Sequence, residues 1–144
     1  MLARERGISS VEMVLVSPIL LIILFSIIEF GIILFDKALI TNASREAARS
    51  AIALRQTPLT ASQLSALSSS VVTNYTTGII DFQGATPTVT TTTATDPNGY
   101  GKFLTVKVAF SYKTLVIGKL FSLIPNKTLQ DPVLLSSSMT MYME

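Results

Sequence analysis

The apolar residues of the chain are concentrated in one long segment near its N-terminus. From Met13 to Phe35, 18 of 23 residues are apolar, and Glu29 is the one charged residue among them. A helix of that length rises about 35 Å, which exceeds the hydrocarbon thickness of a bilayer, about 30 Å. A cleaved secretory signal has a shorter apolar core that ends in a small-residue cleavage site, and nothing of that kind directly follows Phe35. The pattern predicts a membrane-spanning helix over 13–35.

Helix-forming residues continue beyond the membrane segment. Residues 37–54 contain neither glycine nor proline, and the small residues Ala43, Ala47 and Ala51 recur at a spacing of four. We therefore expect the membrane helix to extend into water and to offer these alanines as a helix–helix contact. Pro18 lacks a backbone N–H and is expected to kink the helix one turn inside the membrane segment.

The second half of the chain contains shorter segments, each with the spacing of apolar residues that is typical of a helix or a strand. Apolar residues at helical spacing over 60–75 predict a second helix. Leu104, Val106, Val108 and Phe110 alternate with more polar residues, which predicts a strand over 103–112 with one dry face. The further elements expected are an extended β-branched run at 86–95, a turn at 96–101, a short apolar helix or loop at 115–124 and a strand at 133–143. The fold class predicted is α+β: a long N-terminal membrane helix that continues into a domain with a second helix and a small antiparallel sheet.

Charge and composition exclude several classes of function. Eleven Lys and Arg against nine Asp and Glu give a net charge of +2, spread along the chain, so no nucleic-acid surface is expected. The 144 residues include no cysteine and no histidine, which excludes disulfides, thiol chemistry, His-ligated metals and imidazole-based triads. We expect no enzyme activity, no cofactor, no metal and no small-molecule substrate.

The residues in front of the membrane segment form a recognisable motif. A short basic leader ends at Gly7, and five residues later Glu12 opens the apolar run. This arrangement resembles the processing site of type IV prepilins. The resemblance implies that a membrane-embedded aspartyl peptidase cuts after Gly7 on the cytoplasmic face, so that the mature chain begins at Ile8.

Glu12 has two interpretations. A carboxylate and a free α-amine are each costly in an apolar bundle, but they partly cancel when Glu12 of one subunit pairs with the Ile8 amine of the next. Glu12 would then set the register of a filament. Alternatively, Glu12 only occupies the first turn of a helix, where the helix dipole favours a negative charge. The local pattern supports both interpretations about evenly.

About 45 residues extend the resemblance to one family. Gly7, the Val11-Glu12 pair, Pro18, the run Glu29-Phe30-Gly31 and an Ala/Arg-rich helix over 42–49 follow in order. This stretch resembles the N-terminal region of the TadE-like pseudopilins, components of tight-adherence (Flp-type) pili. Met13 stands where the short major pilins of such systems usually carry Tyr, and those pilins lack so large a C-terminal domain. The resemblance therefore implies a minor component.

The resemblance also implies a topology and a set of partners. Residues 1–7 would be the leader, 8–56 the long helix and 57–144 an extracytoplasmic domain. The chain would be a single-pass protein of the cytoplasmic (inner) membrane that reaches the pilus or cell surface after assembly. Its partners would be the prepilin peptidase, other pilin or pseudopilin subunits and the assembly platform. The alternative function is an uncleaved membrane anchor whose external domain binds a partner.

Glu29 is an acidic residue inside an apolar span. It lies 17 residues beyond Glu12, about 26 Å along a helix, and so is expected near the outer edge of the bilayer. Such a residue faces a partner helix or water when it is functional. Snorkelling or protonation at the membrane surface is the alternative interpretation.

Overall fold

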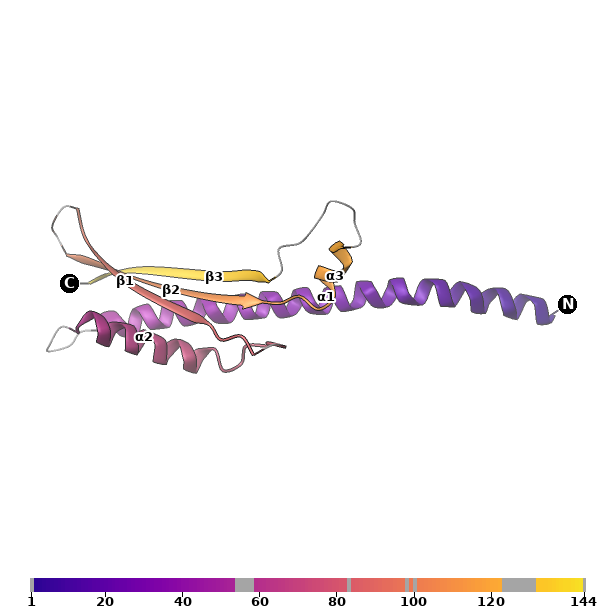
Figure 1. The fold of residues 1–144 in the computed structure, drawn as a ribbon, viewed down its shortest axis with the longest axis horizontal. Coiled ribbons are helices and arrows are strands. Elements are labelled where there is room, and N and C mark those ends of the chain that lie inside the picture. The colour runs from indigo at the N-terminus through magenta and orange to yellow at the C-terminus, as the bar shows by residue number, and fades with distance from the viewer. Residues whose placement is uncertain are drawn as a thin grey trace. The chain divides into compact units, whose positions relative to one another are not determined.

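A computed structural model describes residues 2–53, 59–82, 84–97, 99, 101–122 and 132–143. It confirms the α+β class, with a long N-terminal apolar helix, a second helix and a three-stranded antiparallel sheet (Figure 1). In chain order the elements are α1 (Leu2–Ile52), α2 (Ala61–Tyr75), β1 (Thr88–Thr95), β2 (Lys102–Tyr112), α3 (Ile117–Ser122) and β3 (Val133–Met143).

The chain divides into two compact units. The first comprises Met1–Ile32 and Thr114–Gln130, and thus the N-terminal part of α1 together with α3. The second comprises Ile33–Lys113 and Asp131–Glu144, and contains the rest of α1, α2 and the sheet. The expected division into 1–7, 8–56 and 57–144 concerns processing and membrane topology, and it stays a prediction.

Helix α1 is longer at its start than the pattern indicated. It begins at Leu2, within the predicted leader, and ends at Ile52, while residues 54–58 lie outside the described part of the chain. The helix is continuous through Pro18, where the ring removes one backbone donor without ending the helix. The predicted kink at Pro18 stays a prediction.

Helix α2 starts at a complete capping box. The Thr60 hydroxyl accepts from the Gln63 backbone N–H at 3.4 Å, and the Gln63 side chain accepts from the Thr60 N–H at 2.9 Å. These bonds satisfy donors that a helix start leaves without intrahelical partners. The helix predicted over 60–75 is confirmed, and Leu64, Ser68 and Val72 form its buried face at a spacing of four residues.

Strand β2 is the centre of the sheet. It pairs antiparallel with β1, with Val108 opposite Val89, and with β3, with Val108 opposite Ser137. The predicted dry face is confirmed, because Leu104, Val106 and Val108 are fully buried while their neighbours along β2 are more exposed. The same face also buries Phe110 and Tyr112.

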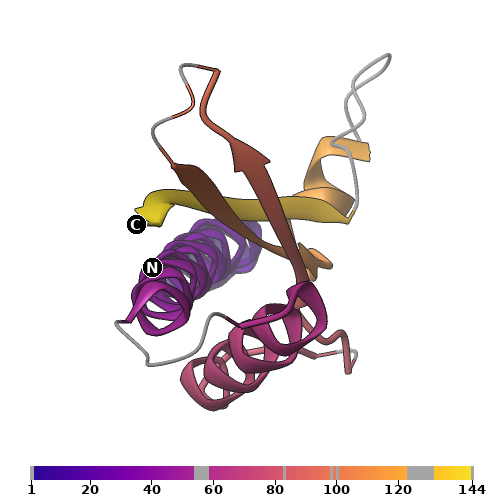
Figure 2. The ribbon, with the colours of Figure 1, turned by 90° about the vertical axis from the view of Figure 1, so that its left-hand side faces the viewer.

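One face of the sheet carries the helices of the second unit. The C-terminal part of α1 and all of α2 lie on this face (Figure 2). Two hydrogen bonds join α1 to β3: the Lys37 ammonium donates to the Ser136 carbonyl, and the Ser44 and Ser137 hydroxyls bond at 2.9 Å. The core consists of apolar side chains from α1, α2 and the sheet, chiefly Ile40, Ala43, Ala47, Leu64, Val72, Leu104, Val106, Val108, Phe110 and Tyr112.

Candidate functional site

The motif at the start of the chain lies within α1. The predicted cleavage site, Gly7–Ile8, has helical backbone, and its side chains lie outside the described part of the structure. Glu12 is exposed on the helix surface. An exposed carboxylate directly before the apolar run is available to a group on another subunit.

The apolar surface of α1 faces outward. Met13, Val14, Ile19 and Ile27 are more than half exposed, and the other apolar residues from Leu15 to Phe30 are 39–68% exposed. Among the described residues, Ser10–Ile52 contains a stretch long and apolar enough to cross a bilayer. Exposed apolar side chains of this extent are unfavourable in water and favourable in lipid. The first unit thus has the surface of a membrane helix.

Glu29 is the acidic exception on this surface, and it is 4% exposed. Its carboxylate accepts three backbone N–H groups: those of Val116 at 2.9 Å and Ile117 at 2.8 Å, and that of Leu115. Ile117 is the first residue of α3, whose opening N–H groups have no intrahelical partners. The carboxylate and the N–H groups satisfy each other, so Glu29 is bound within its own chain. The expected contact of Glu29 with a partner helix stays a prediction.

Asp36 is a second buried carboxylate on α1, and the sequence reasoning missed it. Oδ1 accepts from the Ile80 backbone N–H at 3.0 Å, while Oδ2 is buried without a hydrogen-bond partner. Burial raises the pKa of the Asp36 carboxyl above 3.8; the negative charge of Asp81 adds to the rise, and the Ile80 N–H opposes it. The signal in the sequence was an acidic residue directly after Phe35, seven positions beyond Glu29.

The alanine stripe is covered within the second unit. Ala43 and Ala47 are fully buried and Ala51 is 6% exposed. The neighbouring Ser44 and Ala48 are also fully buried, which the stripe alone did not indicate. Small side chains allow the α1 backbone to lie close to the elements that cover it. The contact predicted between this stripe and another helix stays a prediction.

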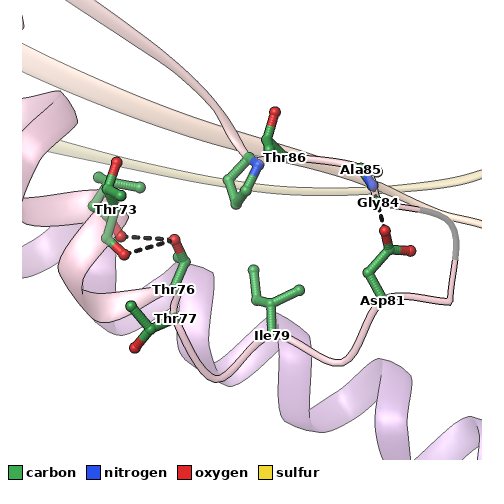
Figure 3. A pocket seen from close by; sticks show the side chains of 10 residues that line it. Thr73, Thr76, Thr77, Ile79, Asp81, Gly84, Ala85 and Thr86 are labelled. Atoms are coloured by element: carbon green, nitrogen blue, oxygen red, sulfur yellow. Dashed lines mark hydrogen bonds between the residues drawn. The ribbon is translucent and has the colours of Figure 1, made fainter.

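A pocket of about 350 Å³ lies between the end of α2 and the chain leading into β1 (Figure 3). The hydroxyls of Thr73, Thr76 and Thr77 each donate to a backbone carbonyl about one turn earlier. The Asp81 carboxylate accepts from the Ala85 N–H. These polar groups already have partners in the chain, so the pocket presents little that would orient a ligand. Within the described residues, no three acidic side chains gather to hold a metal ion.

These observations define a class of protein: a membrane-anchored α+β protein whose described residues contain one helix of membrane-spanning length, near the N-terminus. The sequence model of the TadE-like protein family matches residues 7–49, so the first third of the chain is a TadE-like region. This match confirms the resemblance found in the sequence. No curated protein and no solved structure matches the chain significantly. The TadE-like region indicates a pseudopilin-type component of a membrane-associated Tad pilus assembly.

Proposed function

We propose that this chain is a minor structural subunit, or a factor that primes assembly, of a tight-adherence pilus. One observation carries the proposal: the TadE-like match covers Gly7, Glu12 and the whole membrane segment in one continuous stretch. The separate sheet-containing unit supports a minor role, because the short major pilins of these systems have no domain of this size. The proposed role is structural, without catalysis.

In the proposed pathway, a prepilin peptidase removes residues 1–7 on the cytoplasmic side of the inner membrane. The new Ile8 amine and the Glu12 carboxylate of a neighbouring subunit then pair within the apolar bundle, which lowers the cost of burying each charge. The exposure of Glu12 on α1 is compatible with this pairing. Residues 57–144 would lie outside the membrane and reach the pilus or the cell surface with the assembled subunits.

The mass of the mature chain tests this proposal. The chain is produced in cells that contain the pilus system, extracted from membranes and measured intact. Loss of Met1–Gly7 is the expected result. Retention of these residues would contradict the proposal and favour the second candidate function, an uncleaved membrane anchor with a partner-binding external domain. The outward apolar surface of α1 favours an anchor in either case.

A further inference from the structure

The backbone contacts of Glu29 fix the position of an apolar segment, Leu115–Leu120, beside the membrane helix. Glu29, α3 and the residues leading into α3 belong to the same compact unit. Three N–H groups at the start of the segment bind one carboxylate, which holds this end of the segment against α1 (Figure 1). The segment therefore lies at the level of Glu29 along the helix.

That level is inside the apolar stretch of α1. Glu29 precedes Phe35 by six residues, so it lies about 9 Å before the end of the apolar run. Phe25 and Ile28, close to Glu29 on the same helix, are about half exposed. In a bilayer that covers these side chains, the Glu29 contacts fall at the boundary between acyl chains and headgroups, where interfacial helices bind.

The composition of the segment suits this boundary. Leu115 is 43% exposed, and Val116, Ile117 and Leu120 are partly exposed. Lys119 is exposed among them, and no acidic residue occurs from Lys113 to Ile124. Lysine side chains reach from an apolar layer to lipid phosphates, and anionic headgroups attract them. Unpaired backbone N–H groups would be costly in this layer, and Glu29 removes that cost.

We propose that Leu115–Leu120 is a second membrane contact of this protein, inserted into the interfacial layer at the C-terminal end of the span and held there by Glu29. Lipid is favoured over a neighbouring subunit because the exposed side chains of the segment continue the lipid-facing surface of α1 within one unit. The proposal rests on the membrane anchoring of 13–35 and is independent of cleavage and of pilus assembly.

The absence of tryptophan from the chain allows a direct test. Single-tryptophan variants Leu115→Trp and Leu120→Trp are reconstituted in nanodiscs at one chain per disc, with lipids brominated near the headgroup. Phe30→Trp, at an exposed position of the span beside Glu29, is the control for lipid contact at this depth, and Tyr142→Trp on β3 is the control for a position in the sheet unit. Lipid quenching and quenching by aqueous acrylamide are measured for each variant.

The expected result is lipid quenching at both positions that exceeds that of Tyr142→Trp by at least about threefold, together with protection from acrylamide. Quenching of Leu115→Trp and Leu120→Trp no stronger than that of Tyr142→Trp would overturn the proposal. Because each disc holds a single chain, no other subunit could shield the segment from lipid. That result would therefore favour a neighbouring subunit over lipid as the partner of the segment. It would not affect the proposed function, which the mass measurement tests separately.

Two further variants test how the segment is held. Adding Glu29→Ala to Leu115→Trp is expected to reduce lipid quenching at least about twofold, because the three N–H groups lose their acceptor. Glu29→Gln keeps a carbonyl acceptor and is expected to have an intermediate effect, which separates this role from general unfolding. Lys119→Glu is expected to weaken quenching in anionic discs more than in neutral ones. Unchanged quenching in both Glu29 variants would contradict the holding role.

Discussion

The carboxylate of Glu29 accepts the backbone N–H of Val116 at 2.9 Å, across 87 positions of sequence. A carboxylate that accepts several N–H bonds is stabilised by charge-assisted hydrogen bonding, which makes it tolerable among apolar side chains. The relationship gives an acidic residue in a membrane-type helix a structural partner in its own chain. Glu12, at the other end of the apolar run, is exposed and remains available to another subunit.

Replacing Gly7 tests the cleavage site. Gly7→Val is expected to insert into the membrane but to escape processing, because the peptidase must approach the backbone closely where a side chain would intrude. Intact mass of the extracted chain measures the outcome. Ala3→Val changes the leader by a similar side chain away from the cleavage site and is expected to be processed like the wild type. Normal processing of Gly7→Val would rule out cleavage at this position.

Replacing Glu12 tests the role in subunit register. Glu12→Ala is expected to be processed and inserted but recovered in the sheared pilus fraction at a strongly reduced level, because the neighbour's Ile8 amine stays buried without a counter-charge. Glu46→Ala serves as the control. It removes an acidic side chain whose Oε1 lies 2.9 Å from Nη2 of Arg49 on the same helix. An exposed pair of this kind contributes little to stability. Equal recovery of Glu12→Ala and Glu46→Ala in the pilus fraction would argue that Glu12 does not set the register of the subunits.

Proteolysis tests the attachment of the segment after β2. Glu29→Ala is expected to destabilise the bound segment by at least about 2 kcal/mol, since three N–H groups lose a charged acceptor. Trypsin should then cleave after the exposed Lys119 several times faster in micelles. Cleavage after Lys107, in the central strand β2, is the internal control and should not change. A wild-type rate at Lys119 would mean that the contacts of Glu29 do not retain the segment.

Asp36 predicts an unusual dependence of stability on pH. Because its pKa is raised in the folded chain, the folded state binds a proton more tightly than the unfolded state does. This contribution is fully present below about 3.8, the ordinary value, and is lost as the pH rises through the raised pKa. Asp36→Asn should therefore be at least as stable as the wild type at neutral pH, and its stability should change less with pH.

Melting temperatures of the wild type and of Asp36→Asn between pH 4 and pH 8 provide the measurement. Glu46→Gln is the control, since a hydrogen bond from Arg49 lowers the pKa of Glu46 and gives its contribution the opposite sign. If the melting temperatures of the wild type and of Asp36→Asn change with pH at the same rate, Asp36 does not govern the pH dependence of stability.

The sheet unit is expected to require its part of α1. In mild detergent, which covers the apolar segment Leu115–Leu120, a fragment 36–144 should stay dispersed and melt cooperatively, whereas 58–144 should be less stable or aggregate. The shorter fragment lacks the fully buried Ile40, Ala43 and Ala47, and burial of Ile40 alone is worth about 1.5–3 kcal/mol. Circular dichroism and gel filtration measure the difference. Equal melting temperatures would contradict the packing of α1 in this unit.

Ala47→Leu in fragment 36–144 tests the same packing by a point change. Ala47 is fully buried, and a larger side chain there should cost about 1–3 kcal/mol by overpacking. Arg45→Leu places the same side chain at an exposed position of α1 and is the matched control. Similar melting temperatures for both variants would place Ala47 outside the packed core.

Local patterns in the sequence were sufficient to predict the elements of this fold. The apolar run over 13–35 predicted the membrane-type helix because segment length and hydrophobicity need no knowledge of contacts. Alternation along β2 predicted its buried face because the pleat of a strand repeats every two residues. The prepilin-like motif at Gly7 and Glu12, followed in order by Pro18, Glu29-Phe30-Gly31 and the Ala/Arg-rich helix over 42–49, was sufficient to indicate the TadE-like family.

Tertiary structure decided which partners the acidic residues of α1 acquire. The sequence marked Glu29 as exceptional but left a partner helix, water and the membrane surface open, and it gave no role to Asp36. Their partners, Val116 and Ile80, lie 87 and 44 positions away. Whether such a backbone N–H reaches a carboxylate depends on how distant segments pack, and a local periodicity carries no information about that packing.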